Sequence, residues 1–384
     1  MSADSSTRSR PRRLGARWWR ALRFAAALLL LALQAAPAAA QASRQPWQIL
    51  MDAATEANLS NDFVTAEALL GAALELAQQT DPNGPRPVLS RLMLQLIYAD
   101  LGKPEMSQRL GSLRLDVATF DPTLLLFAGT LDRLANKYYD RWAALRDAGN
   151  SDEIRNKRGL LLAESERCAL LKWAIQNKLL PATDVALATT IAFHGLIFEK
   201  QWKLADAIVK YETAVKIWDA AEDRRKRLMT SSAQFSLFSG RGAGAGDQTD
   251  NPISVKLLLA RTHISIAEDH LEKKKQPEAD AALKRAEPLL VEMIALFDQV
   301  WPSHPRTAVF HSQLGNLYFL QLRHAESATA FRKSIAIYEG SEGSKSDNTR
   351  YVVQRLVKVL RADDRESEAA ELEERYGVKP NPGK

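Results

Sequence analysis

Histidines, a lone cysteine and a glycine-rich segment are the residues of this 384-residue chain that could most directly do chemistry. The closest helical pair of histidines, His263 and His270, would lie about 10.5 Å apart along a helix axis. One metal ion cannot bridge them, because it binds each nitrogen at about 2 Å. None of the six histidines has HxxxH or HExxH spacing, and Cys168 is the only cysteine. The sequence therefore predicts no metal centre and no cofactor.

The remaining catalytic patterns are also incomplete. The glycines of Gly240–Gly246 alternate with other residues, and neither a preceding strand nor a following Lys-Ser or Lys-Thr completes a phosphate-binding loop. Asp247, Asp250 and Asn251 lack the glycine and the terminal glutamate of a calcium loop. No Gly-x-Ser-x-Gly pattern marks a nucleophile. We therefore expect no catalytic residues, with an enzyme site in the segment 123–176 as the open alternative.

The charge of the chain is concentrated at its start. Residues 1–40 hold seven arginines and one aspartate, which equals the whole net charge of +6. The residues from Gln41 onward carry no net formal charge, so they offer no long-range attraction to a phosphate polymer. We expect a protein or peptide partner and no nucleic acid. The oligomeric state is left open.

The first 40 residues have the layout of a secretory signal. An Arg-rich stretch up to Arg23 precedes the apolar run Phe24–Leu33, and small residues follow at Ala38 and Ala40. The ten apolar residues fall short of the roughly 20 that a membrane crossing needs. We expect cleavage before Gln41, or one step later at Ser43, and export to the periplasm or the medium. The alternative is a retained leader that anchors an envelope assembly factor in the membrane.

From Gln41 onward the chain is predicted to be entirely helical. Apolar residues recur at spacings of three and four, and almost no stretch alternates as a strand does. Cys168 lies on the apolar flank of one such helix, where a buried, inert thiol is expected. The predicted organisation is a signal peptide (1–40), N-terminal hairpins (41–118), a divergent long helical pair (119–181), a hairpin (182–223), a flexible insertion (224–252), C-terminal repeats (253–378) and a tail (379–384).

One set of residue types recurs in a common frame. After the pair Leu314-Gly315 comes an aromatic residue three positions past the glycine, and Ser327, Phe331 and Ser334 follow at offsets of 12, 16 and 19 from Gly315. Further copies contain the following residues: Gly195, Phe198, Ala207, Tyr211 and Ala214; Ala267, His270, Ala279, Leu283 and Ala286; Ala54, Ala57, Ala66, Leu70 and Ala73; Val357, Leu360 and Ala369. Small residues at these offsets allow two helices to cross closely.

These spacings resemble the tetratricopeptide repeat (TPR). The 42-residue step from Ser327 to Ala369, with His304-Pro305 before the hairpin, looks like the kinesin-light-chain type of the repeat. The resemblance implies an all-α, α-α superhelix, a TPR-like solenoid of antiparallel helix pairs. It weakens over residues 89–115 and fails over 123–176, where we expect two long helices or, alternatively, a separate small domain.

The resemblance also implies where a partner binds. In this family the first helix of each hairpin lines the concave face, and its solvent-facing residues contact the ligand. The residues in these positions are Arg261, Ile264, Glu268 and Glu272, then Ser312, Asn316 and Phe319, then Tyr351, Gln354, Lys358 and Arg361. The predicted function is an exported, non-catalytic scaffold for protein–protein interaction, with Lys358 and Arg361 placed to receive a carboxylate.

Overall fold

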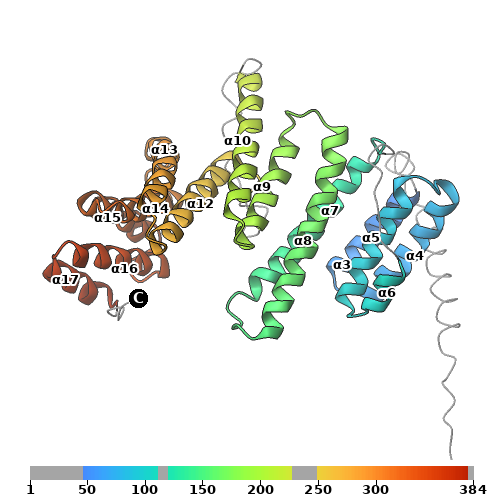
Figure 1. Ribbon diagram of the computed structural model, residues 1–384, viewed down its shortest axis with the longest axis horizontal. Helices are drawn as coiled ribbons and strands as arrows, with labels where there is room; N and C mark the ends of the chain where they lie inside the picture. Colours follow the sequence, from blue (N-terminus) through green and yellow to red (C-terminus); the bar gives the residue numbers. More distant parts are fainter. Residues whose placement is uncertain (1–45, 111–119, 227–248, 379–384) are drawn as a thin grey trace, which may run out of the picture. The chain divides into compact units, whose positions relative to one another are not determined.

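The structure is a computed structural model that describes residues 46–110, 120–226 and 249–378, and all regular elements in these ranges are α-helices (Figure 1). The chain divides after Leu179 into an N-terminal unit and a C-terminal unit. The predicted all-α fold of antiparallel helix pairs is confirmed. The predicted leader, the tail and residues 227–248 of the predicted insertion lie outside the described ranges. Within those ranges, no helix has the length and apolarity that a membrane crossing needs.

The N-terminal unit contains two hairpins and one long helix pair. Its helices are α3 (Pro46–Leu59), α4 (Phe63–Thr80), α5 (Pro85–Asp100), α6 (Pro104–Arg109), α7 (Leu124–Ala144) and α8 (Asp152–Leu179). The pair α7 and α8 lies in the segment 119–181, where the sequence predicts two long helices. Helix α7 packs along α8 and also contacts α3, the first helix of the unit.

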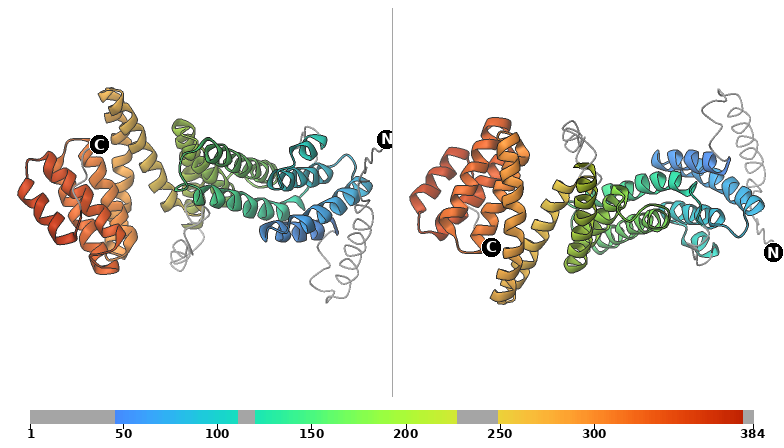
Figure 2. Two further views of the ribbon diagram at one scale, coloured as in Figure 1. Left: turned by 90° about the horizontal axis from the view of Figure 1, so that it is seen from below. Right: turned by 90° about the horizontal axis from the view of Figure 1, so that it is seen from above.

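The C-terminal unit is a regular stack of four hairpins (Figure 2). Its helices are α9 (Val185–Lys200), α10 (Leu204–Lys226), α12 (Pro252–Glu272), α13 (Gln276–Val300), α14 (Pro305–Leu320), α15 (His324–Glu342), α16 (Asp347–Ala362) and α17 (Glu366–Tyr376). Each second helix packs on the first helix of the next hairpin. The first helices α9, α12, α14 and α16 also contact one another in succession, so they form one layer of a solenoid.

The turn between the helices of each hairpin is the same in both units. One residue of each turn is left-handed, with φ between 57° and 63°: Asn61, Gly102, Trp202, Lys274, Leu322 and Asp364. The amide of the following residue donates to the carbonyl five positions before it, at 2.8 to 2.9 Å. This bond satisfies a carbonyl at the end of the first helix. The repeated turn shows that the hairpins share one geometry.

The small residues of the sequence frame lie where the helices of a hairpin cross. Five positions after five of these six left-handed residues stand Ala66, Ala207, Ala279, Ser327 and Ala369, and each is 0% exposed. The Oγ of Ser327 donates to the carbonyl of Gly315 on the facing helix at 2.7 Å. A Cβ at Gly315 would lie 2.9 Å from the Phe331 ring, and one at Gly195 would lie 2.7 Å from the Tyr211 ring. The TPR-like frame is therefore confirmed as the packing frame of these hairpins.

A buried histidine makes the stability of the C-terminal unit sensitive to acid. His263 on α12 is 3% exposed, and burial, together with the positive charge of Arg285, lowers its pKa to about 4. In the unfolded chain a histidine binds its proton near pH 6.5. The contribution of neutral His263 to the free energy of unfolding is therefore fully present above pH 6.5, and it is lost as the pH falls from 6.5 to 4. We expect His263→Gln to remove about 1–2 kcal/mol of this pH dependence, measured by urea unfolding at pH 7 and pH 4.5. An unchanged difference between the two pH values would contradict this assignment.

Candidate functional site

The first-helix face of the N-terminal unit is covered by the unit's own long pair. The residues that would face a ligand in this frame are buried, except that Asp100 is buried only in its side chain: Gln48, Met51, Thr55 and Asn58 on α3, and Leu89, Leu92, Leu96 and Asp100 on α5. Helix α7 packs against α3, and Arg167 of α8 donates to Gln95 of α5. The rings of Trp47 and Phe127 are 5.8 Å apart, and the Lys137 ammonium donates to Asn58 Oδ1 at 2.7 Å. No partner can reach this face without displacing α7.

A buried polar contact holds α7 at the far end of that face. The hydroxyl of Tyr138 donates to Asp100 at 3.0 Å, and Arg141 forms an ion pair with the same carboxylate. Burial, with the nearby Asp100 charge, raises the pKa of Tyr138. The hydroxyl therefore stays a donor at neutral pH.

The segment considered for an enzyme site holds a half-buried acid, Glu164, and a buried thiol, Cys168. Burial raises the pKa of Glu164 on α8, and it also raises the pKa of Cys168, whose side chain is inaccessible. A thiol that is protonated and enclosed is a poor nucleophile. In the part of the chain that the structure describes, no group of three His, Cys, Asp or Glu residues could hold a metal ion.

The C-terminal unit leaves its first-helix face open over most of the predicted positions. Arg261 and Glu272 of α12 and Tyr351, Gln354 and Lys358 of α16 are exposed. Glu268 of α12 and Asn316 and Phe319 of α14 are half-buried. Two expected surface residues are not on the surface, because Ile264 is 3% and Ser312 6% exposed. Both are in first helices that also contact the neighbouring first helices.

The structure brings Phe319 and Lys358 together. The ammonium of Lys358 lies 5.5 Å from the centre of the Phe319 ring, and the ring of His324 lies 5.9 Å from it. A cation above an aromatic face is attracted by the ring quadrupole and keeps its charge available to a ligand. These residues come from consecutive first helices, α14 and α16, and the first residue of α15.

Arg361 does not present the free cation that the sequence predicts. Its guanidinium forms ion pairs at 3.0 Å with both Glu366 and Glu373 of α17. These hydrogen bonds raise the pKa of Arg361. Because it already donates to two carboxylates of its own hairpin, Arg361 secures α17 to α16 and is poorly available as a donor to a partner's carboxylate.

A cation that the sequence analysis missed takes its place. Arg355 lies 5.4 Å from the Tyr351 ring centre and donates to the Tyr351 hydroxyl at 3.0 Å. The four-residue spacing of an aromatic residue and an arginine on one helix was the available signal. Nearby Arg350 donates to the carbonyl of Gly377 at 3.4 Å.

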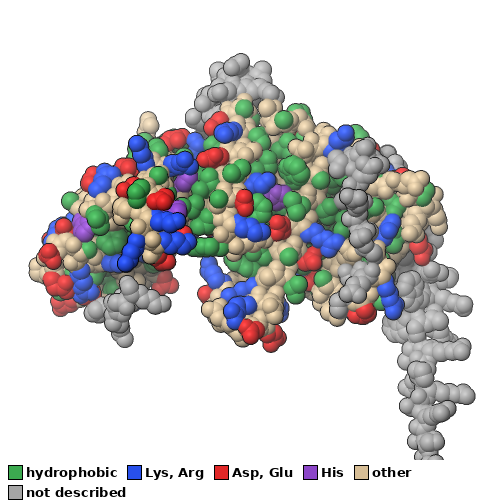
Figure 3. Space-filling model, in the orientation of Figure 1, with side chains coloured by type: hydrophobic (Ala, Val, Ile, Leu, Met, Phe, Trp, Pro, Cys, Tyr) green, Lys and Arg blue, Asp and Glu red, His purple; other side chains and the backbone are tan. Residues whose placement is uncertain are grey.

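We define the α16 face as Arg350, Tyr351, Gln354, Arg355 and Lys358 of α16 with Asn316 and Phe319 of α14. Acidic and basic side chains are interspersed over the molecular face drawn in Figure 3, and cations at the end of α12 and in the α14–α15 turn pair with carboxylates three or four positions away. On the α16 face, by contrast, no carboxylate of the described residues pairs with Arg350, Arg355 or Lys358 within 4.0 Å. Helix α16 itself holds one acidic residue, Asp347, against four cations. The face therefore carries an uncompensated positive charge beside two aromatic rings.

No family model and no curated protein matches the chain. Among solved structures, a Podosopora anserina protein described as a kinesin light chain with nearly identical TPR-like repeats is 16% identical, with 63% of this chain and 94% of that chain covered and a TM-score of 0.43. BtubC (BKLC) from P. vanneervenii is 17% identical, with 66% and 95% covered and a TM-score of 0.42. The assembly chaperone of RpL4 (Acl4, residues 1–338) is 16% identical, with 86% and 89% covered and a TM-score of 0.40. At such low identity and TM-score, the fold assignment rests on the repeated turns and helix crossings described above.

Proposed function

We propose that the chain is a non-catalytic scaffold for protein–protein interaction, and that its C-terminal unit binds an acidic segment of a partner protein on the α16 face. One observation carries this proposal: Arg350, Arg355 and Lys358 have no carboxylate partner among the described residues, and aromatic rings support two of them. The TPR-like arrangement of the hairpins supports a helical interaction scaffold in general terms.

The chemistry of the face favours an acidic segment with an apolar residue next to it. Aromatic and arginine side chains commonly dominate the energy of protein interfaces. Phe319 offers an apolar contact, Asn316 can hydrogen-bond a peptide backbone, and the cations attract carboxylates. Arg261, Glu268 and Glu272 on α12 extend the same layer with both signs of charge. In this proposal, the acidic segment of the partner lies along α16.

A capture experiment tests the proposal. Cell-envelope extract is passed over the purified chain starting at Gln41, and over the same chain with Arg355→Glu and Lys358→Glu. We expect the double variant to lose the main partner by at least about tenfold, since each reversed charge repels the partner's carboxylates. The matched control reverses two exposed lysines of second helices, Lys216→Glu and Lys284→Glu, and should bind like the parent.

Equal capture by the double variant, with an unchanged melting temperature, would place the binding surface elsewhere. If the Asn316→Ala variant captures the same partner more weakly, then the Asn316 side chain contacts the backbone of the partner's segment. Rising salt should weaken parent binding, because the pairs on this face are solvent-exposed and screened.

We further propose that the protein is exported and loses its leader near Ala40. The Arg-rich start, the short apolar run and the small residues at Ala38 and Ala40 support this. Intact-mass measurement of the exported protein is expected to show a chain beginning at Gln41 or Ser43. A membrane-bound product that retains Arg8 to Arg23 would instead identify an anchored assembly factor.

A further inference from the structure

A hollow lies on the side of α14 that is turned away from Asn316. It opens between α13 and α15, has α14 as its floor and has a volume of about 410 Å³. We call it the outer trough, and its lining residues are Val291, Ile294, His311, Leu314, Tyr318, Ala325, Glu326, Thr329, Ala330 and Lys333. The volume is in the range of small-molecule sites. Small side chains at Ala325, Thr329 and Ala330 leave this space open along α15.

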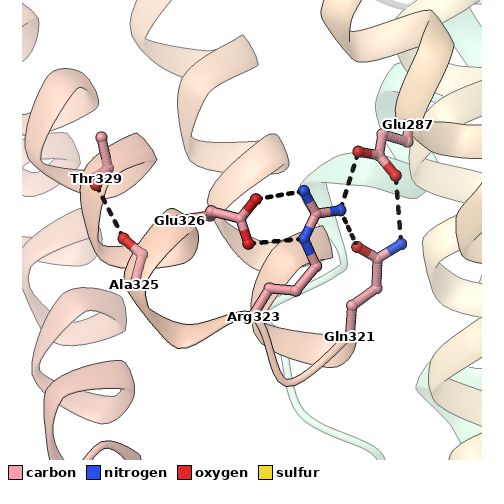
Figure 4. Close-up of polar contacts among 6 residues, drawn as sticks. All are labelled: Glu287, Gln321, Arg323, Ala325, Glu326 and Thr329. Carbon is pink, nitrogen blue, oxygen red and sulfur yellow. Dashed lines mark hydrogen bonds and ion pairs between the residues drawn. The ribbon is translucent and has the colours of Figure 1, made fainter.

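One end of the trough is bridged by a polar network (Figure 4). Arg323, at the start of α15, donates to Glu326 at 2.8 Å and to Glu287 of α13 at 3.0 Å. Gln321 accepts from the same guanidinium at 2.8 Å, and the Arg323 guanidinium carbon lies 4.0 Å from the Tyr318 ring centre. This network connects α13 with α15 across the groove. It limits the length of any occupant, which favours a small molecule over a long partner helix.

Almost every polar side chain that lines the trough is already bonded within the protein. His311 contacts Asp298 at 3.0 Å, Thr329 donates to the carbonyl of Ala325 at 2.9 Å, and Glu326 is bound by Arg323. Lys333 differs, because no carboxylate of the described residues pairs with its ammonium. The remainder of the lining is apolar. The trough therefore combines an apolar interior with one available positive charge at the end away from the network.

We propose that the outer trough binds a small carboxylic acid with an apolar chain, the chain lying on Val291, Ile294 and Leu314 and the carboxylate meeting Lys333. Each methylene group that leaves water favours binding by about 0.8 kcal/mol, and the Lys333 contact selects a negative head group. Asp298 lies at the same end and is hydrogen-bonded to His311. Its charge disfavours a head group on the α13 side and directs the carboxylate toward α15. This site is independent of the α16 face.

Decanoate, below the concentration at which it forms micelles, is the probe for a titration calorimetry test with the full chain. We expect saturable binding at one site per chain. Decyltrimethylammonium, which has the same chain and the opposite charge, should bind at least about tenfold more weakly. Equal affinity for the two probes, or no saturable decanoate binding by the folded protein, would overturn the proposal.

Two variants separate the chain contact from the head-group contact. Thr329→Phe fills the trough from its exposed wall and should weaken decanoate at least about tenfold. Lys333→Glu should weaken decanoate and remove the preference over decyltrimethylammonium. The control Lys284→Glu makes the same charge change on an exposed site of α13 and should bind like the parent. If Thr329→Phe lowers the melting temperature, Ala325→Leu, also at an exposed position, replaces it. Decanoate binding that neither filling variant affects would contradict the assigned site.

Discussion

Replacing Gly315 with leucine is expected to destabilise the C-terminal unit by about 1–3 kcal/mol. The first side-chain carbon alone would lie 2.9 Å from the ring of Phe331, which is fully buried on the facing helix. The ring cannot move away freely, because it belongs to a core that includes Ile335, Val353 and Leu356. The two helices must therefore separate, which also strains the bond from Ser327 to the Gly315 carbonyl. The loss should appear as a lower urea midpoint and a lower melting temperature.

A second glycine provides the control for this prediction. Gly340 is in α15, and a Cβ there would meet no atom within 4 Å. Gly340→Ala should stabilise the protein by about 0.5–1 kcal/mol through reduced backbone entropy of the unfolded chain. Gly315→Ala gains the same entropic benefit, but its Cβ meets the Phe331 ring. The melting temperature of Gly315→Ala should therefore be lower than that of Gly340→Ala. Identical melting of Gly315→Leu and the parent would show that the crossing is misplaced.

The helical repeats were predictable because close packing restricts residue type at few positions. Ala207, Ala279 and Ser327 must be small where two backbones cross, and the spacing from glycine to aromatic ring follows from the same crossing. The turns were harder to place. Trp202 and Leu322 adopt left-handed conformations, which glycine and asparagine adopt far more often. The sequence therefore does not predict a turn at either position.

Helical periodicity predicted the face of the candidate site but not the partners of its residues. Lys358 and Arg361 are three residues apart on one helix, yet Lys358 contacts Phe319 of α14 and Arg361 contacts Glu366 and Glu373 of α17. Contacts across a hairpin depend on how the next helix is placed, which one helix's pattern does not contain. The same limit applies to the buried Ile264 and Ser312, which belong to first helices that contact the neighbouring first helices.

The covering of the N-terminal first-helix face by α7 could not be predicted from the repeat frame. The frame fails in residues 123–176, so it gives no position for this helix pair. In the structure, α7 contacts α3 and provides Tyr138 and Arg141 to Asp100 of α5. This arrangement leaves the C-terminal unit as the part of the described chain with an open first-helix face. It also makes Asp100 a decisive residue for the N-terminal unit.

Asp100→Ala is expected to lower the free energy of unfolding by about 2–4 kcal/mol. The carboxylate is 5% exposed, and its removal leaves the buried Tyr138 hydroxyl without its acceptor and Arg141 without its counter-ion. Arg141 is partly exposed and can be hydrated, so most of the cost comes from Tyr138. Faster hydrogen exchange along α7 should accompany the loss, because this contact fixes the helix on α5.

The exposed ion pair between Glu56 of α3 and Arg133 of α7 is the matched control. Both of its side chains are largely exposed, so Glu56→Ala should cost less than about 1 kcal/mol. A double-mutant cycle then tests the mechanism: in the Tyr138→Phe background the hydroxyl is absent, and Asp100→Ala should cost clearly less than in the parent. If Asp100→Ala costs the same in both backgrounds, or no more than Glu56→Ala, then apolar contacts such as Trp47 on Phe127 hold α7 in place and the buried carboxylate does not.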